Sequence, residues 1–175
     1  PGTGSDAFTL YYSTFYKTWV FNRTAVDATS NPVYIRNIAT VVNPPLNVWT
    51  HLTGVFDTKG DTDPKNDTIS LLVNGRPQGP PIVASSAAPP YTPWTASGGL
   101  EFGRSKVGGV NGEYFKGRID EVAAWQRALT PDEVVQEARL ETGDVNAPEP
   151  AVELVADWDA TRATSGSGQI ADWSN

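Results

Sequence analysis

The acidic side chains are the first residues in this sequence that could carry out chemistry, because a pair of carboxyl groups can hydrolyse a glycosidic bond. A retaining enzyme of that kind holds its carboxyl groups about 5 Å apart, and a strand that reads Glu-x-Asp-x-Glu places them on one face. No run of that form occurs, and Asp120 and Glu121 are neighbours, whose side chains would point to opposite faces of a strand. The sequence therefore predicts no local catalytic pair.

A cluster of carboxylates between residues 57 and 67 could bind calcium, which prefers oxygen ligands. An EF-hand loop that began at Asp61 would need glycine in place of Asn66 and a bidentate glutamate in place of Leu72. Because both are missing, we interpret this segment as a solvated loop between strands.

His51 is the only histidine, and the chain has no cysteine. One histidine leaves zinc sites and multi-histidine sites short of ligands, and the lack of thiols removes disulfides and cysteine nucleophiles. A Ser-His-Asp triad around His51 is conceivable, but we interpret this histidine as a packed or surface residue.

Composition limits the elements that could position such residues. The 175 residues allow one domain with its own core, and no run approaches the roughly 20 apolar residues of a membrane span. The formal charge of −7 argues against nucleic-acid binding and suits neutral or cationic ligands. The lack of methionine and the loop-like start indicate a piece of a longer, processed protein. We expect one globular domain with no nucleic-acid partner and no membrane insertion.

Glycine and proline divide the chain into short segments of alternating or β-branched apolar residues, a pattern typical of antiparallel all-β domains. The sharpest turn signal is Asn74-Gly75, which tolerates positive φ. The predicted strands are residues 7–13, 17–22, 32–42, 48–57, 68–74, 82–84, 99–104, 113–125 and 151–159.

One helix is predicted from Thr130 to about Leu140. Thr130 is an N-cap residue, Pro131 suits the first helical position, and Glu133 completes a capping box. Its apolar side should pack against the strands.

Several motifs occur in an informative order: residues 49–57 (WTHLTGVFD), 69–75 (ISLLVNG), 102–103 (FG), 115–122 (FKGRIDEV) and 128–130 (ALT) before the helix. Together they resemble the LamG-like jelly-roll family of the concanavalin A-like superfamily over residues 7–141. The resemblance implies an all-β fold, an antiparallel β-sandwich jelly roll with one short helix on its C-terminal side.

Family members open with a strand that carries a Trp and a "D.S.N" turn, and that opening is missing before residue 7. Residues 154–158 (LVADW) and 172–175 (DWSN) look like it. We therefore divide the chain into a domain over 1–143, a linker over 144–150 and a tail over 151–175. The tail either begins the next copy or docks as the missing strand on this sandwich or a neighbour, and we prefer docking.

The resemblance also implies a structural calcium ion. In this superfamily the Asp of the "IDEV" strand and the Asp of the opening turn often share one, so Asp120 matches the first and Asp172 with Asn175 the second. The alternatives are a carboxylate that accepts backbone hydrogen bonds at Asp120 and a disordered terminus at Asp172.

Carbohydrate recognition is the commonest role that the resemblance implies, and aromatic rings stack on sugar faces. Tyr91 and Trp94 are the preferred candidates because they lie in the Pro-rich stretch 85–94, and Tyr16 in the turn after residue 13 follows. The alternative is that this loop packs onto the sandwich.

We expect a non-catalytic, secreted or extracellular module of a larger protein that binds carbohydrate or a glycosylated surface and is stabilised by calcium. One alternative is a structural or interaction domain that pairs strands with neighbouring domains or chains. The other is a glycoside hydrolase or lyase.

Overall fold

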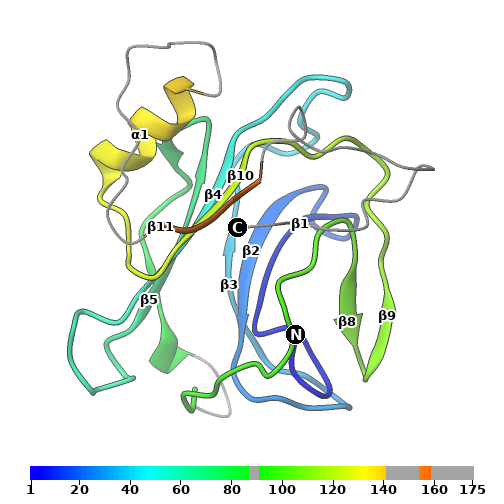
Figure 1. The fold of residues 1–175 in the computed structure, drawn as a ribbon, viewed down its shortest axis with the longest axis vertical. Helices are drawn as coiled ribbons and strands as arrows, with labels where there is room; N and C mark the ends of the chain where they lie inside the picture. The colour runs from blue at the N-terminus through cyan, green and yellow to red at the C-terminus, as the bar shows by residue number, and fades with distance from the viewer. Residues whose placement is uncertain (87–90, 141–153, 159–175) are drawn as a thin grey trace.

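The computed structural model describes residues 1–86, 91–140 and 154–158, which form antiparallel sheets and one α-helix (Figure 1). One sheet has the order β1-β2-β3 and consists of β1 (Phe8–Ser13), β2 (Thr18–Thr24) and β3 (Tyr34–Ile38). The other is built on β4 (Leu52–Asp57) and β5 (Thr68–Val73), with the short strands β6 (Arg76–Pro77) and β7 (Ile82–Val83) both paired to β5.

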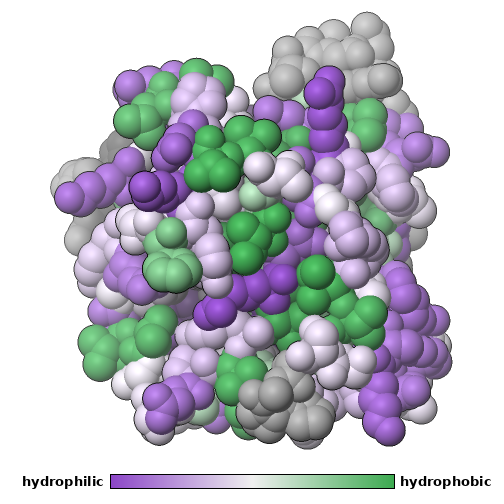
Figure 2. Space-filling view, turned by 180° about the vertical axis from the view of Figure 1, so that it is seen from behind, coloured by the Kyte–Doolittle hydropathy of each residue, from purple (hydrophilic) through white to green (hydrophobic). Residues whose placement is uncertain are grey.

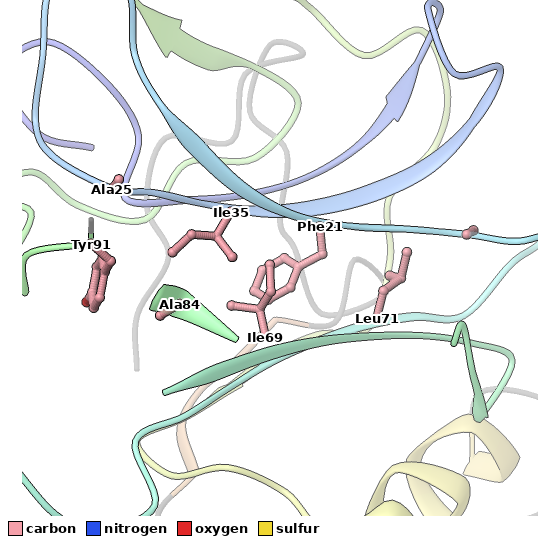
Figure 3. Close-up of a cluster of buried hydrophobic side chains, with 8 residues drawn as sticks. Phe21, Ala25, Ile35, Ile69, Leu71, Ala84 and Tyr91 are labelled. Carbon is pink, nitrogen blue, oxygen red and sulfur yellow. The ribbon is translucent and has the colours of Figure 1, made fainter. Parts of the chain in front are cut away.

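The core lies between these two sheets. Successive strand residues point to opposite faces, so Ile69 and Leu71 of β5 share one face and both are fully buried. They meet Phe21 of β2 and Ile35 of β3, which point toward them from the opposing sheet (Figure 3). The described residues are thus an antiparallel β-sandwich, and the predicted fold class is confirmed.

The helix α1 (Pro131–Leu140) covers the opposite face of β5. Leu72, which alternates with Leu71, forms a second buried cluster with Leu129 and Val134. The predicted capping box is present, because Glu133 N donates to Thr130 Oγ1 over 3.3 Å and Thr130 N donates to Glu133 Oε2 over 2.8 Å. No helix in the described part of the chain is long and apolar enough to cross a membrane.

One predicted turn is confirmed by the structure, and one predicted strand is absent from it. The Asn74-Gly75 turn is confirmed, with φ of 50° and 71°, and it connects β5 to β6. The strand predicted over residues 99–104 is wrong, since the hairpin of β8 (Ser105–Val107) and β9 (Val110–Gly112) follows that segment instead. Gly103 has φ of 73°, which interrupts an extended strand.

The long strand predicted over residues 113–125 is reduced to β10 (Val122–Trp125). Glu113 and Glu121 both have positive φ, 50° and 48°, and this conformation breaks an extended segment before β10. The segment β11 (Leu154–Trp158) pairs antiparallel with β10, with Val122 opposite Trp158. Residues 144–150 lie outside the described residues, so the division into domain, linker and tail stays a prediction.

Candidate functional site

A pocket of roughly 660 Å³ opens where the loop after β4 and the segment 91–96 meet the ends of β1 and β2. The strands bring its residues together from distant parts of the chain. Phe8 of β1 lies opposite Arg23 of β2 in the antiparallel register, and directly opposed residues share one face of a sheet. The aromatic and charged residues of the lining are Phe8, Phe56, Tyr91, Trp94, Arg23, Asp61 and Asp67.

Arg23 is the basic residue of this pocket and is only 3% exposed. Its guanidinium carbon lies near the ring centroids of Phe8 (4.5 Å), Trp94 (4.9 Å), Tyr91 (5.4 Å) and Phe56 (5.7 Å). Nη2 donates to the Trp94 carbonyl over 2.6 Å and to Tyr91 Oη over 3.2 Å. Nε and Nη1 are buried without a hydrogen-bond partner among the residues that the structure describes. The guanidinium group therefore holds the segment 91–94 against the sheet, largely through cation–π contacts.

Asp67 directly precedes β5 and is only 4% exposed. Within the described ranges, no hydrogen bond or ion pair joins its carboxylate to another residue, although its backbone carbonyl accepts from Ala84 N over 2.7 Å. Burial raises the pKa of the Asp67 carboxyl group above its ordinary value. The nearby carboxylates of Asp61, Asp57 and Asp63 raise this pKa further. The positive charge of Arg23 acts in the opposite direction and lowers it.

The acidic loop between β4 and β5 satisfies most of its carboxylates with its own donors. Asp61 accepts from Asn66 Nδ2 and from Asp63 N, each over 2.8 Å, and these hydrogen bonds lower the pKa of its carboxyl group. Asp57 accepts from Lys59 N over 2.8 Å and forms an ion pair with Lys59 Nζ. Among the described residues, no group of three or more acidic or histidine side chains is placed to hold a metal ion.

The structure brings two of the three aromatic candidates together. Tyr91 lies in the core at 7% exposure, with its ring edge-on to Phe56 at 6.0 Å, as the alternative of a loop that packs onto the sandwich predicts. Trp94 is half-buried, and its Nε1 donates to the Thr24 carbonyl over 2.9 Å. Tyr16 is half-buried beside Phe15 and does not line the pocket. Trp94 is thus the candidate best placed to contact a ligand.

Asp120, the first predicted metal ligand, is half-buried, and its Oδ1 accepts from Glu121 N over 3.0 Å. Asp172 and Asn175, the other two predicted ligands, lie outside the described residues. The calcium site stays a prediction.

His51 is positioned by the turn at the end of β5. Its backbone N donates to Asn74 Oδ1 over 2.9 Å, and its carbonyl accepts from Asn74 N over 2.8 Å. Burial lowers the pKa of the His51 imidazole, and Nδ1 is buried with no hydrogen-bond partner in the described chain. These contacts fit the interpretation of His51 as a packed residue rather than a catalytic base.

Exposed apolar residues do not form a stronger candidate. Leu46, Phe15 and Trp49 are 85%, 84% and 65% exposed. On the face that Figure 2 shows, however, apolar side chains lie in separate patches divided by hydrophilic ones. Buried charges distinguish the pocket from these patches.

Sequence reasoning missed Arg23 and Phe8, and it interpreted Asp67 only as part of a solvated loop, whereas the structure buries this residue. A signal for Arg23 exists, because Trp19, Phe21 and Arg23 are alternate residues of β2 and therefore lie on one face of the strand. Phe21 places that face toward the core. A charged residue at a core-facing position needs special partners and is therefore a candidate for function. Asp67 carries no comparable signal, since it follows a run of polar loop residues.

Comparison with known proteins gives a family for the chain. A family model described as the concanavalin A-like lectin/glucanases superfamily, of the laminin G type, matches residues 2–135. This range includes the strands of both facing sheets, the pocket residues and the start of α1. No curated protein and no solved structure matched the chain. With most of its length matched, the chain belongs to the laminin G-like family of the concanavalin A-like lectin/glucanase superfamily.

Proposed function

We propose that this domain is a non-catalytic module that binds carbohydrate in the pocket beside Trp94. The observation that carries the proposal is the pocket lining, which combines aromatic rings with the Asp67 carboxylate, a group without a hydrogen-bond or ion-pair partner among the described residues. The apolar face of a sugar ring packs on aromatic carbon, and its hydroxyl groups donate hydrogen bonds to carboxylates. The volume of roughly 660 Å³ lies within the range of about 300–1,000 Å³ that small-ligand sites occupy.

The fixed position of Trp94 supports this function. Its indole Nε1 and its carbonyl are both hydrogen-bonded, to Thr24 and Arg23 respectively. A ring held in this way loses little conformational entropy when a ligand contacts it. The segment 91–96 would therefore act as a rigid wall of the site.

Hydrolysis is the alternative that the pocket raises, because Asp61 and Asp67 both line it and their pKa values move in opposite directions. Asp61, however, lies exposed on a loop, and both of its carboxylate oxygens already accept hydrogen bonds. An exposed loop does not hold a carboxylate at the fixed separation from a second carboxyl group that glycoside hydrolysis requires. We therefore propose binding without catalysis.

Calcium and an extracellular location form part of the proposal. Carboxylate and amide oxygens are the donors that calcium prefers, so Asp120, Asp172 and Asn175 have suitable chemistry for a structural ion. We propose that the domain works within a larger secreted protein and attaches it to carbohydrate or to a glycosylated surface.

The test is a glycan-array screen of the folded domain with calcium and again with a chelator. The variant Trp94→Ala should lose binding, whereas Trp49→Ala, which removes an exposed Trp outside the pocket, should keep it. Loss of binding with the chelator would support the ion. Equal binding by both variants would remove the pocket from the proposal, and shortened glycan products would replace binding by hydrolysis.

A structural role is the second candidate, and the pairing of β11 with β10 favours it. A strand that docks on a sheet can also dock on the same sheet of a neighbouring copy or domain. Size-exclusion chromatography with light scattering at increasing concentration tests this role. Concentration-dependent dimers that Ala156→Pro abolishes would support strand exchange, and a monomer at every concentration would contradict exchange between copies.

A further inference from the structure

We propose that the pocket selects ligands that carry a protonated amine, so that its preferred carbohydrate is an amino sugar. This inference rests on the proposed function and adds the charge of the ligand to it. The Asp67 carboxylate carries the argument, because it is 4% exposed, lines the pocket and has no hydrogen-bond or ion-pair partner in the part of the chain that the structure describes.

An unpaired carboxylate in such a position is costly. Removing a charged group from water costs free energy unless a counter-charge or several hydrogen bonds replace the lost hydration. A neutral hydroxyl group supplies one hydrogen bond, whereas an ammonium group supplies up to three donors and the missing positive charge. A cationic ligand therefore gains more from Asp67 than a neutral ligand of the same shape.

The other charged groups around Asp67 favour the same sign of ligand. Asp61 lines the pocket as a second carboxylate, and Asp57 and Asp63 lie near enough to affect the Asp67 carboxyl group. Lys59 is engaged in an ion pair with Asp57. The excess of carboxylates leaves this side of the pocket negative.

Arg23 is the opposing charge, and its surroundings limit its effect on a ligand. Nη2 is hydrogen-bonded to Trp94 and Tyr91, while Nε and Nη1 are buried. Aromatic rings surround the guanidinium group with centroids at 4.5 to 5.7 Å. A ligand would therefore meet the aromatic rings and the carboxylates rather than the guanidinium nitrogens.

The experiment compares four probes by isothermal titration calorimetry at pH 6 with the full chain. Three are β-1,4-linked tetrasaccharides of glucosamine, N-acetylglucosamine and glucose, and the fourth is cyclohexylamine, a ring with an amine and no hydroxyl groups. We expect the glucosamine tetrasaccharide to bind about tenfold more tightly than either neutral tetrasaccharide, because it adds a charge-assisted contact.

Two variants test whether Asp67 is the residue that causes the preference for glucosamine. Asp67→Asn keeps the shape of the side chain and should weaken the binding of the glucosamine tetrasaccharide far more than the binding of the glucose tetrasaccharide, so that the preference for glucosamine is lost. Asp132→Asn removes the same charge from an exposed position on α1 and should leave the preference unchanged.

The outcomes separate this inference from the proposed function. Equal binding of all three tetrasaccharides, a preference for neutral sugars, or an amine preference that survives Asp67→Asn would overturn the inference and leave carbohydrate binding in place. Binding of cyclohexylamine without any sugar would overturn carbohydrate binding and keep the cationic site. If none of the four probes binds to a protein that shows a normal melting transition, both carbohydrate binding and the preference for an amine would be overturned.

Discussion

Phe8 and Arg23 lie opposite each other on β1 and β2, and the guanidinium carbon of Arg23 is 4.5 Å from the centroid of the Phe8 ring. The same guanidinium group donates to the carbonyl of Trp94, 71 residues further along the chain. One side chain thus connects the first sheet to the segment that forms a wall of the pocket.

Arg23→Ala should therefore destabilise the fold and loosen the pocket wall. The variant loses two hydrogen bonds and the contacts with the surrounding rings, and it leaves a cavity. We expect the free energy of unfolding to fall by about 2–4 kcal/mol in chemical denaturation. The control Arg76→Ala removes an exposed arginine of β6 and should change the stability by less than about 0.5 kcal/mol. A similarly small effect of Arg23→Ala would contradict the assigned role.

Asp67→Asn should stabilise the unliganded domain at pH 7, because the substitution removes a negative charge that lies in a partly desolvated position beside other carboxylates. Because the pKa of Asp67 is raised in the folded state, the folded state binds more protons than the unfolded state between the ordinary value of 3.8 and the raised value. The wild-type stability should fall as the pH rises through that window, and Asp67→Asn should remove this contribution. Thermal melts from pH 3 upward measure it.

Asp61→Asn provides a comparison of opposite sign for that experiment. The hydrogen bonds from Asn66 and Asp63 lower the pKa of Asp61, so its ionised form is favoured in the folded state. We expect this variant to lower the melting temperature at pH 7. Melting shifts of the same sign for both variants would contradict the different environments of the two carboxylates.

Glu133→Gln should weaken the start of α1. Glu133 forms a two-bond ion pair with Arg127 at 2.8 and 2.6 Å and accepts from Thr130 N, and these contacts lower the pKa of its carboxyl group to about 2. The stabilisation should be complete above the ordinary value of 4.5 and lost as the pH falls toward about 2. Asp132→Asn, which removes a charge from the same turn, should retain this acid dependence, as thermal melts from pH 2 to 6 would show.

Gly54→Ala should force the two sheets apart locally. A Cβ atom at Gly54 of β4 would lie 2.5 Å from two carbon atoms of the Phe21 ring, which is closer than side chains pack. We expect a loss of about 1–3 kcal/mol in the free energy of unfolding, as overpacked cores show. Gly99→Ala is the control, because nothing lies within 4 Å of the added atom and φ there is not positive. Equal stability of the two variants would show that the sheets adjust at no cost.

Local sequence was sufficient for the fold class and for the features that short segments specify. The alternation of apolar residues predicts strands such as β1, β2 and β5, because one face of each must be buried. The Asn74-Gly75 turn and the capping box of Thr130 and Glu133 depend on neighbouring residues, and both are present. The strand limits after residue 98 were predicted poorly, because the alternation of apolar residues does not reveal the positive φ of Gly103 and Glu121.

The pocket, in contrast, was decided by the tertiary structure. Arg23, Asp67 and Trp94 each carry no motif, and they line one pocket only because β1, β2, β5 and the segment 91–96 pack together. Burial changes their chemistry as well, since a surface aspartate and a surface arginine would keep their hydration and need no partner. Local sequence therefore determines which segments become strands, turns and helix, while the distances and burial that give side chains their function arise only when distant segments pack.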